Sequence, residues 1–370
     1  MARRPARAPD RPHLDSMKLL NILLLFVPAA IAAEFMHASP VLIFALSAMA
    51  IVPLSGYLGR ATEEIAAYTG PTLGGLLNAT LGNLAELIIA ILALRAGLVD
   101  LVKASITGSI LGNLLLVLGA AQLVGGLRHR TQRFSVALAG LSISLLVIAV
   151  IGLVIPAVYN STHVDPTRAF TRRVSVGVAV LLIVGYGLSL LYSMGTHRSV
   201  FGEAREVAGE AHAEMDGSRW SLRRAIGTLL VSAGVVGWLS EILVGSTEEA
   251  IQHIGLSQVF VGLIVVPIIG NAAEHSSAVL MAMRNRMDLA VSIAVGSSAQ
   301  VALLIAPVLV FVGLAVGQPM DLAFSTFEVI SVALAVAVAT SVVRDAESDW
   351  LEGAFLLLVY GMLGVAFYYF

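Results

Sequence analysis

The chain has 370 residues, of which 58% are hydrophobic and only 12% charged, a balance typical of an integral membrane protein and not of a soluble domain. Its formal net charge of -2 provides no basic surface for a nucleic acid, so we expect no nucleic-acid partner. The absence of cysteine excludes disulfides, thiol nucleophiles and thiolate metal sites, so any metal ion must bind oxygen or imidazole.

The first segment of the chain, residues 1–17, is basic, and an apolar run from Leu19 to Ala33 follows it. Secretory signals have the same order, but the many later apolar segments favour a signal anchor that is retained. A positively charged start also predicts a cytoplasmic N-terminus. We therefore predict one extra transmembrane helix over 18–34 behind a cytoplasmic segment.

Long apolar runs recur along the whole chain. A helix needs about 20 mostly apolar residues to cross the hydrocarbon core, and these runs are too long and too uniform for the alternating strands of a membrane barrel. The sequence therefore predicts an all-α integral membrane protein with about eleven transmembrane helices. The predicted spans are 18–34, 39–67, 71–96, 99–125, 134–158, 171–194, 221–252, 257–284, 288–315, 320–342 and 350–369.

Basic residues are distributed unevenly between the two sides of this topology. With the N-terminus inside, 17 of the 22 Lys and Arg lie on the inner side, which predicts a cytoplasmic N-terminus and an external C-terminus. The one long polar stretch, 196–220, carries five acidic residues and lies on the cytoplasmic side. Its carboxylates could sense a cation, but no EF-hand spacing is present, and a solvated connector is the simpler interpretation.

Two segments of the chain resemble each other closely. GNLAE at 82–86 recurs as GNAAE at 270–274, an offset of 188 residues, and at the same offset GSIL at 108–111 matches GSSA at 296–299. A Thr-Glu-Glu triplet upstream of each motif recurs at an offset of 185 residues. Such self-similarity indicates that the chain consists of two related halves.

The two predicted halves, 35–195 and 221–370, carry five helices each. Because five is odd, the second half enters the membrane from the side opposite to the first. We therefore predict inverted repeats, with Glu86 and Glu274 brought together at the membrane midplane.

Glu86 and Glu274 lie in apolar surroundings without a compensating cation. No Lys or Arg occurs within 65–94 or 250–283, and an ionised acidic side chain at bilayer depth costs about 2.5 kcal/mol or more. Either protons or a bound divalent cation can neutralise the pair, and calcium prefers such oxygen ligands. Competition between the two for the same carboxylates couples their gradients. We expect calcium and protons as transported partners, no cofactor and no enzymatic reaction.

Polar and flexible residues near the two glutamates complete the predicted binding site for the cation and protons. Glycines before Glu86, and a proline and a glycine before Glu274, weaken the helical hydrogen bonding, so that backbone carbonyls and helix ends can face an ion. Side chains from the following span of each half can add oxygen ligands. Besides the two glutamates, the predicted site contains Gly82, Asn83, Ser109, Asn113, Gly270, Asn271, Ser297, Ser298 and Gln300.

A second group of residues can serve gating or ion access. The Thr-Glu-Glu triplets lie near predicted helix ends, where a carboxylate can also be merely solvated, and the histidine after the second motif can relay protons or only contact a helix. Glu328, in the tenth predicted span, leaves the same choice between function and a hydrogen bond to a neighbouring helix. The gating candidates are Glu63, Glu64, Glu248, Glu249 and His275.

Three segments resemble the calcium/proton antiporters of the cation/calcium antiporter superfamily: GLLNATLGNLAELIIAILAL, VPIIGNAAEHSSAVLMAMRNRMDLAVSIAVGSSAQ and SDWLEGAFLLLVYG. The resemblance extends over nearly the whole chain from about Leu19. It implies an eleven-helix antiporter in which Glu86 and Glu274 alternately bind calcium and protons. It also implies that the first helix and the helix at 171–194 shift to open either side. Two positions depart from the family pattern, Leu84 and Gly112.

Three other functions are weaker interpretations. A sodium/calcium exchanger of the same superfamily needs a cage of oxygens, whereas the dipeptides Leu84-Ala85 and Ala272-Ala273 before the glutamates offer no side-chain oxygen. A passive cation channel would use similar carboxylates, but inverted halves with broken helices favour alternating access. A membrane metal hydrolase lacks an HExxH or comparable spacing. Short loops and an Ala-, Arg- and Gly-rich composition favour a multi-pass protein of a bacterial inner membrane.

Overall fold

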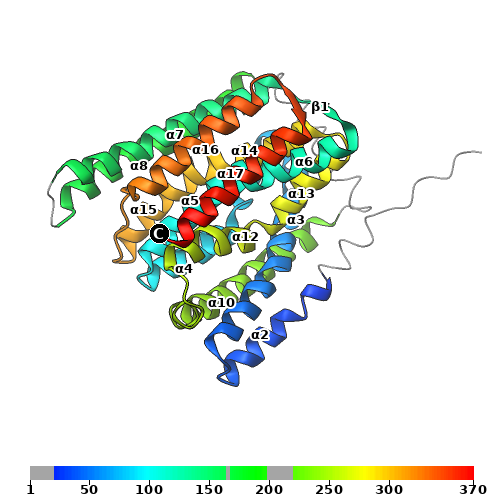
Figure 1. Ribbon diagram of the computed structural model, residues 1–370. Helices are drawn as coiled ribbons and strands as arrows, with labels where there is room; N and C mark the ends of the chain where they lie inside the picture. The colour runs from blue at the N-terminus through cyan, green and yellow to red at the C-terminus, as the bar shows by residue number, and fades with distance from the viewer. Residues whose placement is uncertain (1–20, 164–166, 198–219) are drawn as a thin grey trace, which may run out of the picture.

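The computed structural model describes residues 21–163, 167–197 and 220–370, which form a bundle of long helices (Figure 1). The predicted basic segment 1–17 lies outside these residues, as does most of the predicted connector 196–220.

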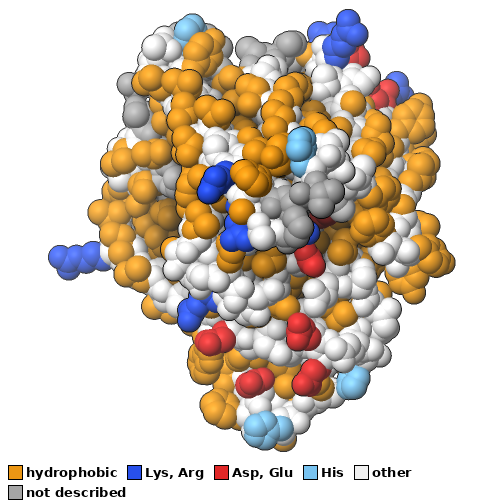
Figure 2. Space-filling model, turned by 90° about the vertical axis from the view of Figure 1, so that its left-hand side faces the viewer, with side chains coloured by type: hydrophobic (Ala, Val, Ile, Leu, Met, Phe, Trp, Pro, Cys, Tyr) orange, Lys and Arg blue, Asp and Glu red, His pale blue; other side chains and the backbone are white. Residues whose placement is uncertain are grey.

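Within the described residues, eight helices are long and apolar enough to cross a membrane. The pair Gln258–Gly270 and Ala272–Met283 is bent by 64° and can form one further span, and a shorter apolar helix covers Asn21–Phe35. The prediction of a helical membrane protein is therefore confirmed. Figure 2 shows hydrophobic side chains over much of one face, with acidic side chains gathered toward its lower end.

The elements of the first half follow the apolar runs of the sequence. They are α2 (Phe26–Phe35), α3 (Pro40–Leu81), α4 (Leu84–Arg95), α5 (Val99–Leu111), the π-helical turn η1 (Gly112–Val117), α6 (Leu118–His129), α7 (Val136–Thr162), α8 (Ala169–Leu191) and the π-helical turn η2 (Tyr192–Thr196).

The second half has a similar succession of elements. They are α10 (Leu222–Ile254), α11 (Gln258–Phe260), η3 (Val261–Val265), α12 (Val266–Gly270), α13 (Ala272–Met283), α14 (Met287–Gln300), η4 (Val301–Ile305), α15 (Ala306–Ala315), α16 (Thr326–Val343) and α17 (Trp350–Tyr368).

The helices form three groups across the bundle (Figure 1). On one side α3 packs against α2 and α10, and on the other α7 packs against α8 and α16. Between them α14 contacts α5, α6 and α13, and α6 contacts α13. The two motif glutamates belong to α4 and α13.

Glycines set how closely the central helices approach. An added Cβ at Gly262 would lie 2.7 Å from Leu101 O and 2.7 Å from Ala104 Cβ, and one at Gly108 would clash with the backbone of Leu263. Small residues at such crossings let two helical backbones pack directly. The segment Gln258–Gly270, which precedes the break at Asn271, is thereby held against α5.

Two helix boundaries differ from the prediction. The predicted spans 39–67 and 71–96 are joined in α3 by a kink at Gly70, whose φ of +81° suits glycine. The predicted span 320–342 becomes helical only at Thr326, because Ser325 and Glu328 form a capping box there.

A small sheet joins two of the loops. Strands β1 (Thr131–Arg133) and β2 (Glu347–Asp349) pair antiparallel, with Gln132 opposite Ser348. The sequence analysis did not predict them, because three residues are too few for a visible alternating pattern.

Candidate cation-binding site

The candidate site lies at the breaks in two helices. α3 ends at Leu81 and α4 starts at Leu84, while α12 ends at Gly270 and α13 starts at Ala272. Asn83 (φ -92°, ψ 24°) and Asn271 (φ -106°, ψ 10°) occupy the two breaks with similar non-helical backbones. The breaks occur where the sequence predicted them.

Glu86 and Glu274 lie in the first turns of the helices that follow these breaks. The backbone N–H groups of a first turn have no partner within the helix, and the helix dipole is positive there. This end of a helix therefore stabilises a carboxylate that would be costly elsewhere in the bilayer.

Glu86 is buried, with 9% of its surface exposed. Its Oε1 accepts hydrogen bonds from Ser109 Oγ of α5 and from Asn271 Nδ2 of the other half of the chain. Its Oε2 is buried and has no hydrogen-bond partner among the described residues. One oxygen of this carboxylate is thus held by neutral donors, and the other is available to a ligand.

Glu274 is less enclosed than Glu86 and is only half-buried. Its Oε2 accepts a hydrogen bond of 2.7 Å from Ser297 Oγ of α14. The carboxylates of Glu63 and Glu86 act on it electrostatically. Serine and glutamate are 23 residues apart in both halves, Glu86 with Ser109 and Glu274 with Ser297.

The predicted backbone positions Gly82 and Gly270 lie beside the glutamate of the opposite half. An added Cβ at Gly82 would lie 3.7 Å from Glu274 Oε1, and one at Gly270 would lie 2.8 Å from Glu86 Cγ. The second distance is shorter than a Cβ contact allows, so glycine is required at 270 for Glu86 to hold its position.

Two more of the predicted residues, Asn83 and Gln300, are connected to Glu274 through Ser297. Asn83 Nδ2 donates to Gln300 Oε1 over 2.9 Å, and Ser297 Oγ lies 3.2 Å from Asn83 Oδ1. Ser298 is different, because its hydroxyl lies against backbone carbonyls, Ala294 O of its own helix at 3.0 Å and Ile110 O of α5 at 3.5 Å. Asn113 is buried with an amide nitrogen that has no hydrogen-bond partner in the described part of the chain.

A family model described as sodium/calcium exchanger protein matches residues 39–195 and 224–369. The chain belongs to this family. Every site residue described above lies within the matched regions.

Similar proteins cover almost the whole chain. A protein named Ca(2+)/H(+) antiporter from Aphanothece halophytica is 46% identical over 356 residues, covering 94% of this chain and 95% of that protein. The Ca(2+)/H(+) antiporter ChaA of Bacillus subtilis is 39% identical over 343 residues, covering 92% of this chain and 96% of that protein. The solved structure of native YfkE superposes with a TM-score of 0.82 at 36% identity, covering 95% of this chain and 100% of that chain.

The two Thr-Glu-Glu triplets have different surroundings in this exchanger-family chain. Glu63 acts electrostatically on Glu274, as noted above, and Glu64 Oε2 accepts a hydrogen bond of 3.1 Å from the backbone of Trp220. Glu248 and Glu249 are exposed on α10. The structure therefore brings Glu63 toward the site and gives Glu64 a part in anchoring the chain before α10.

Trp220 is a residue that the sequence analysis missed. Two guanidinium groups lie close to its ring, with Arg60 Cζ at 4.3 Å and Arg224 Cζ at 4.6 Å from the ring centroid. Its carbonyl accepts a hydrogen bond of 2.7 Å from Tyr68 Oη. These contacts fasten the chain just before α10 to α3, the helix that leads into the first break. The sequence feature that could have pointed to it is a tryptophan flanked by basic residues at the end of the polar stretch 196–220.

His275 and Glu328 were left with two interpretations each. His275 is half-buried, and its Nε2 has no hydrogen-bond partner within the described ranges. Glu328 accepts hydrogen bonds from Ser325 N at 3.0 Å and from Thr107 Oγ1 at 3.2 Å. Glu328 therefore caps α16 and connects it to α5, which is the structural interpretation.

A buried ion pair was also missed. Lys103 Nζ lies 2.5 Å from Asp321 Oδ1 and donates to Ala323 O over 3.0 Å, and Arg168 Nη1 lies 3.4 Å from Asp321 Oδ2. The pair holds the non-helical segment before α16 against α5. The two residues are far apart in the sequence, so no local pattern pointed to their contact.

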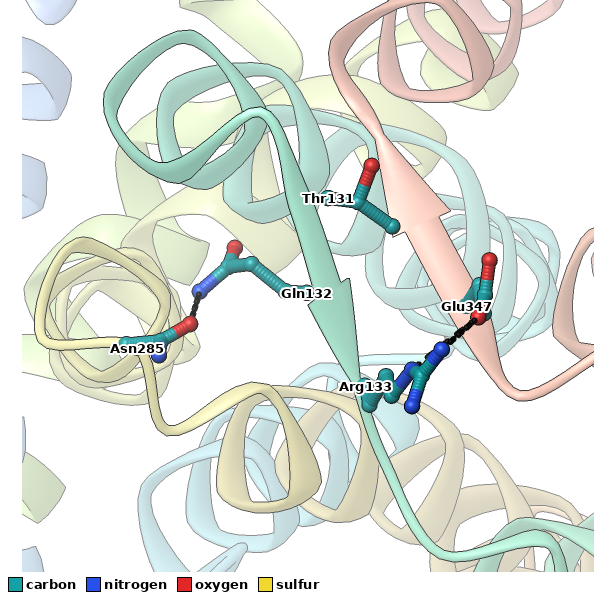
Figure 3. A pocket seen from close by; sticks show the side chains of 5 residues that line it. All are labelled: Thr131, Gln132, Arg133, Asn285 and Glu347. Atoms are coloured by element: carbon teal, nitrogen blue, oxygen red, sulfur yellow. Dashed lines mark hydrogen bonds and ion pairs between the residues drawn. The ribbon is translucent and has the colours of Figure 1, made fainter.

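A polar cavity of about 480 Å³ lies beside the small sheet, lined by Thr131, Gln132, Arg133, Asn285 and Glu347 (Figure 3). Gln132 Nε2 donates to Asn285 Oδ1 over 3.0 Å, and Arg133 pairs with Glu347. Asn285 lies beyond the C-terminal end of α13 at Met283, which is about 13 Å along the helix from Glu274 at 1.5 Å per residue. This cavity is therefore separate from the two glutamates.

Proposed function

We propose that the chain is a secondary active transporter that exchanges Ca²⁺ for H⁺ across a membrane by alternating access. Cation and protons compete in it for Glu86 and Glu274. One observation carries this proposal: each glutamate lies against the motif of the opposite half, since Asn271 donates to Glu86 and Gly82 lies beside Glu274, so that the two carboxylates share one site.

The side chains around the two glutamates have the chemistry that exchange requires. Two carboxylates, two serine hydroxyls and two asparagine side chains offer oxygen ligands of the kind that calcium prefers. Protonation of the same carboxylates removes their charge and their ligand capacity, so calcium and protons exclude each other. The relatives named Ca(2+)/H(+) antiporter support protons as the counter-ion over sodium.

The architecture of the proposed transporter is that of two inverted five-helix halves, 35–195 and 221–370, after one extra helix over 18–34, eleven spans in all. The broken helices and the matched serine-glutamate pairs support this arrangement. In it α2 and α8 shift to expose the site to either side. The N-terminus is cytoplasmic, the C-terminus is outside, and the membrane is a bacterial cell membrane.

The test is calcium-driven proton movement in sealed vesicles containing the purified protein, without sodium. The expected result is proton movement that Glu86→Gln and Glu274→Gln each abolish, because a neutral amide can neither release a proton nor cancel the charge of calcium. Glu34→Gln, at an exposed glutamate of α2, is the matched control and keeps full activity. Unchanged flux in either site variant contradicts the proposal, and flux that requires sodium would assign the chain to sodium/calcium exchange.

A second measurement addresses shared occupancy. Calcium binding to the purified protein is expected to fall as the solution is made acidic, because protons take the same carboxylates. Binding that stays constant from neutral to strongly acidic pH contradicts competition between the two ions.

A further inference from the structure

The two glutamates receive different numbers of hydrogen bonds, although their surroundings come from matched segments. Glu86 accepts from Ser109 and from the amide of Asn271. Glu274 accepts from Ser297, and the matching amide, that of Asn83, donates instead to Gln300. The asparagine amide that donates to the glutamate in the case of Glu86 thus donates to another side chain in the case of Glu274.

Even the one donor of Glu274 is shared. Ser297 Oγ lies 2.7 Å from Glu274 Oε2 and 3.2 Å from Asn83 Oδ1, and a hydroxyl carries a single proton. In the first half Ser109 Oγ lies 3.5 Å from the amide nitrogen of Asn271, so its proton is free for Glu86. Glu274 therefore has the weaker set of donors.

The repeat identifies the residue responsible. At the offset of 188, Gln300 corresponds to Gly112, which has no side chain to engage Asn271. An added Cβ at Gly112 would meet no atom within 4 Å, so space does not dictate the glycine. The difference between the two halves at this position is one of chemistry: an amide acceptor in one and none in the other.

We propose that Gln300 is a positioning residue that makes the two glutamates inequivalent. By accepting the hydrogen bond of Asn83, it withholds from Glu274 the donor that Asn271 gives to Glu86. Glu274, half-buried and with few donors, is then the carboxylate that calcium engages first, whereas Glu86 is the enclosed one. This inference rests on the proposed exchange function and concerns how its site is built.

Removal of the acceptor has a defined consequence. The oxygen of Asn83 and Glu274 Oε2 lie near the same serine hydroxyl, so a flip of the Asn83 amide directs its nitrogen toward Glu274. That added donor competes with calcium for the carboxylate oxygens. A net hydrogen bond is worth about 1 kcal/mol, so we expect the half-saturating calcium concentration to rise about fivefold.

The experiment compares Gln300→Met, which keeps the length of the side chain without the amide, with the wild type in sealed vesicles. The half-saturating calcium concentration is expected to rise while the maximal rate is unchanged. In an Asn83→Leu background the same substitution is expected to have no effect, because no amide remains to be redirected. Gly112→Ala, at the corresponding position of the other half, is the control and is expected to leave both parameters unchanged.

Three results would overturn the inference: an equal rise in both backgrounds, a loss of maximal rate without a change in half-saturation, or no change at all. Gln300→Leu replaces Gln300→Met if the latter is not produced, and calcium binding to purified protein gives the same comparison if Asn83→Leu does not transport. A wild type without calcium-driven proton flux would instead contradict the proposed function. Failure of the inference is therefore distinguishable from failure of the function.

Discussion

Lys103→Met is expected to destabilise the protein more than Arg168→Met, because it leaves the buried carboxylate of Asp321 without its nearer cation. Lys103 and Asp321 are buried, with side-chain exposures of 8% and 6%, and their charged atoms lie 2.5 Å apart. Removal of one partner from a buried pair typically costs 3–5 kcal/mol because the other charge stays buried. Arg168 still contacts Asp321 at 3.4 Å and compensates in part, so we expect a loss of about 3 kcal/mol, at the lower end of that range.

Two further variants separate charge from packing. Arg168→Met is expected to cost less than about 1 kcal/mol, because its side chain is 58% exposed and solvent screens the interaction. The double variant Lys103→Met with Asp321→Asn is expected to recover most of the stability, since Asn can still accept the hydrogen bond of Ala323 N. The measurement is reversible unfolding in mixed micelles followed by tryptophan fluorescence. The reasoning is refuted if Lys103→Met unfolds like the wild type or if the double variant is less stable than the single one.

Further changes test other contacts of the structure. Gly270→Ala should reduce calcium-driven proton flux strongly, because its Cβ would lie 2.8 Å from Glu86 Cγ, while Gly296→Ala, which has open space, should transport normally; equal activities would contradict the close approach. Trp220→Leu should leave the protein folded but make the chain before α10 more sensitive to protease, because two cation–π contacts of about 1 kcal/mol each are lost. An unchanged cleavage rate would show that this anchor is unimportant.

Local patterns in the sequence were sufficient for the helical class of the protein and for the breaks beside the two glutamates. Apolar runs longer than a membrane crossing predict helices whatever their neighbours are, since the bilayer requires every backbone group to be paired within the segment. The glycines before Glu86, and Pro267 and Gly270 before Glu274, predicted the two breaks, and the structure has them at Asn83 and Asn271. Because the motifs recur at a fixed offset of 188 residues, the candidate site residues of one half pointed to those of the other.

Which side chains meet across the halves was beyond such patterns. Repeat symmetry alone would give Glu274 the amide of Asn83, just as Glu86 has that of Asn271. The structure gives that amide to Gln300 instead. The choice depends on a side chain present in one half and absent from the other, and on its orientation after folding.

The sequence by itself determined that this is a helical membrane protein with two matched, broken-helix motifs, because hydropathy and periodicity are properties of neighbouring residues. Only the tertiary structure decided which donors each glutamate receives and that Lys103 is neutralised by Asp321. Those contacts join segments about 200 residues apart, and hydrogen bonds depend on distances and angles that exist only when the helices are packed.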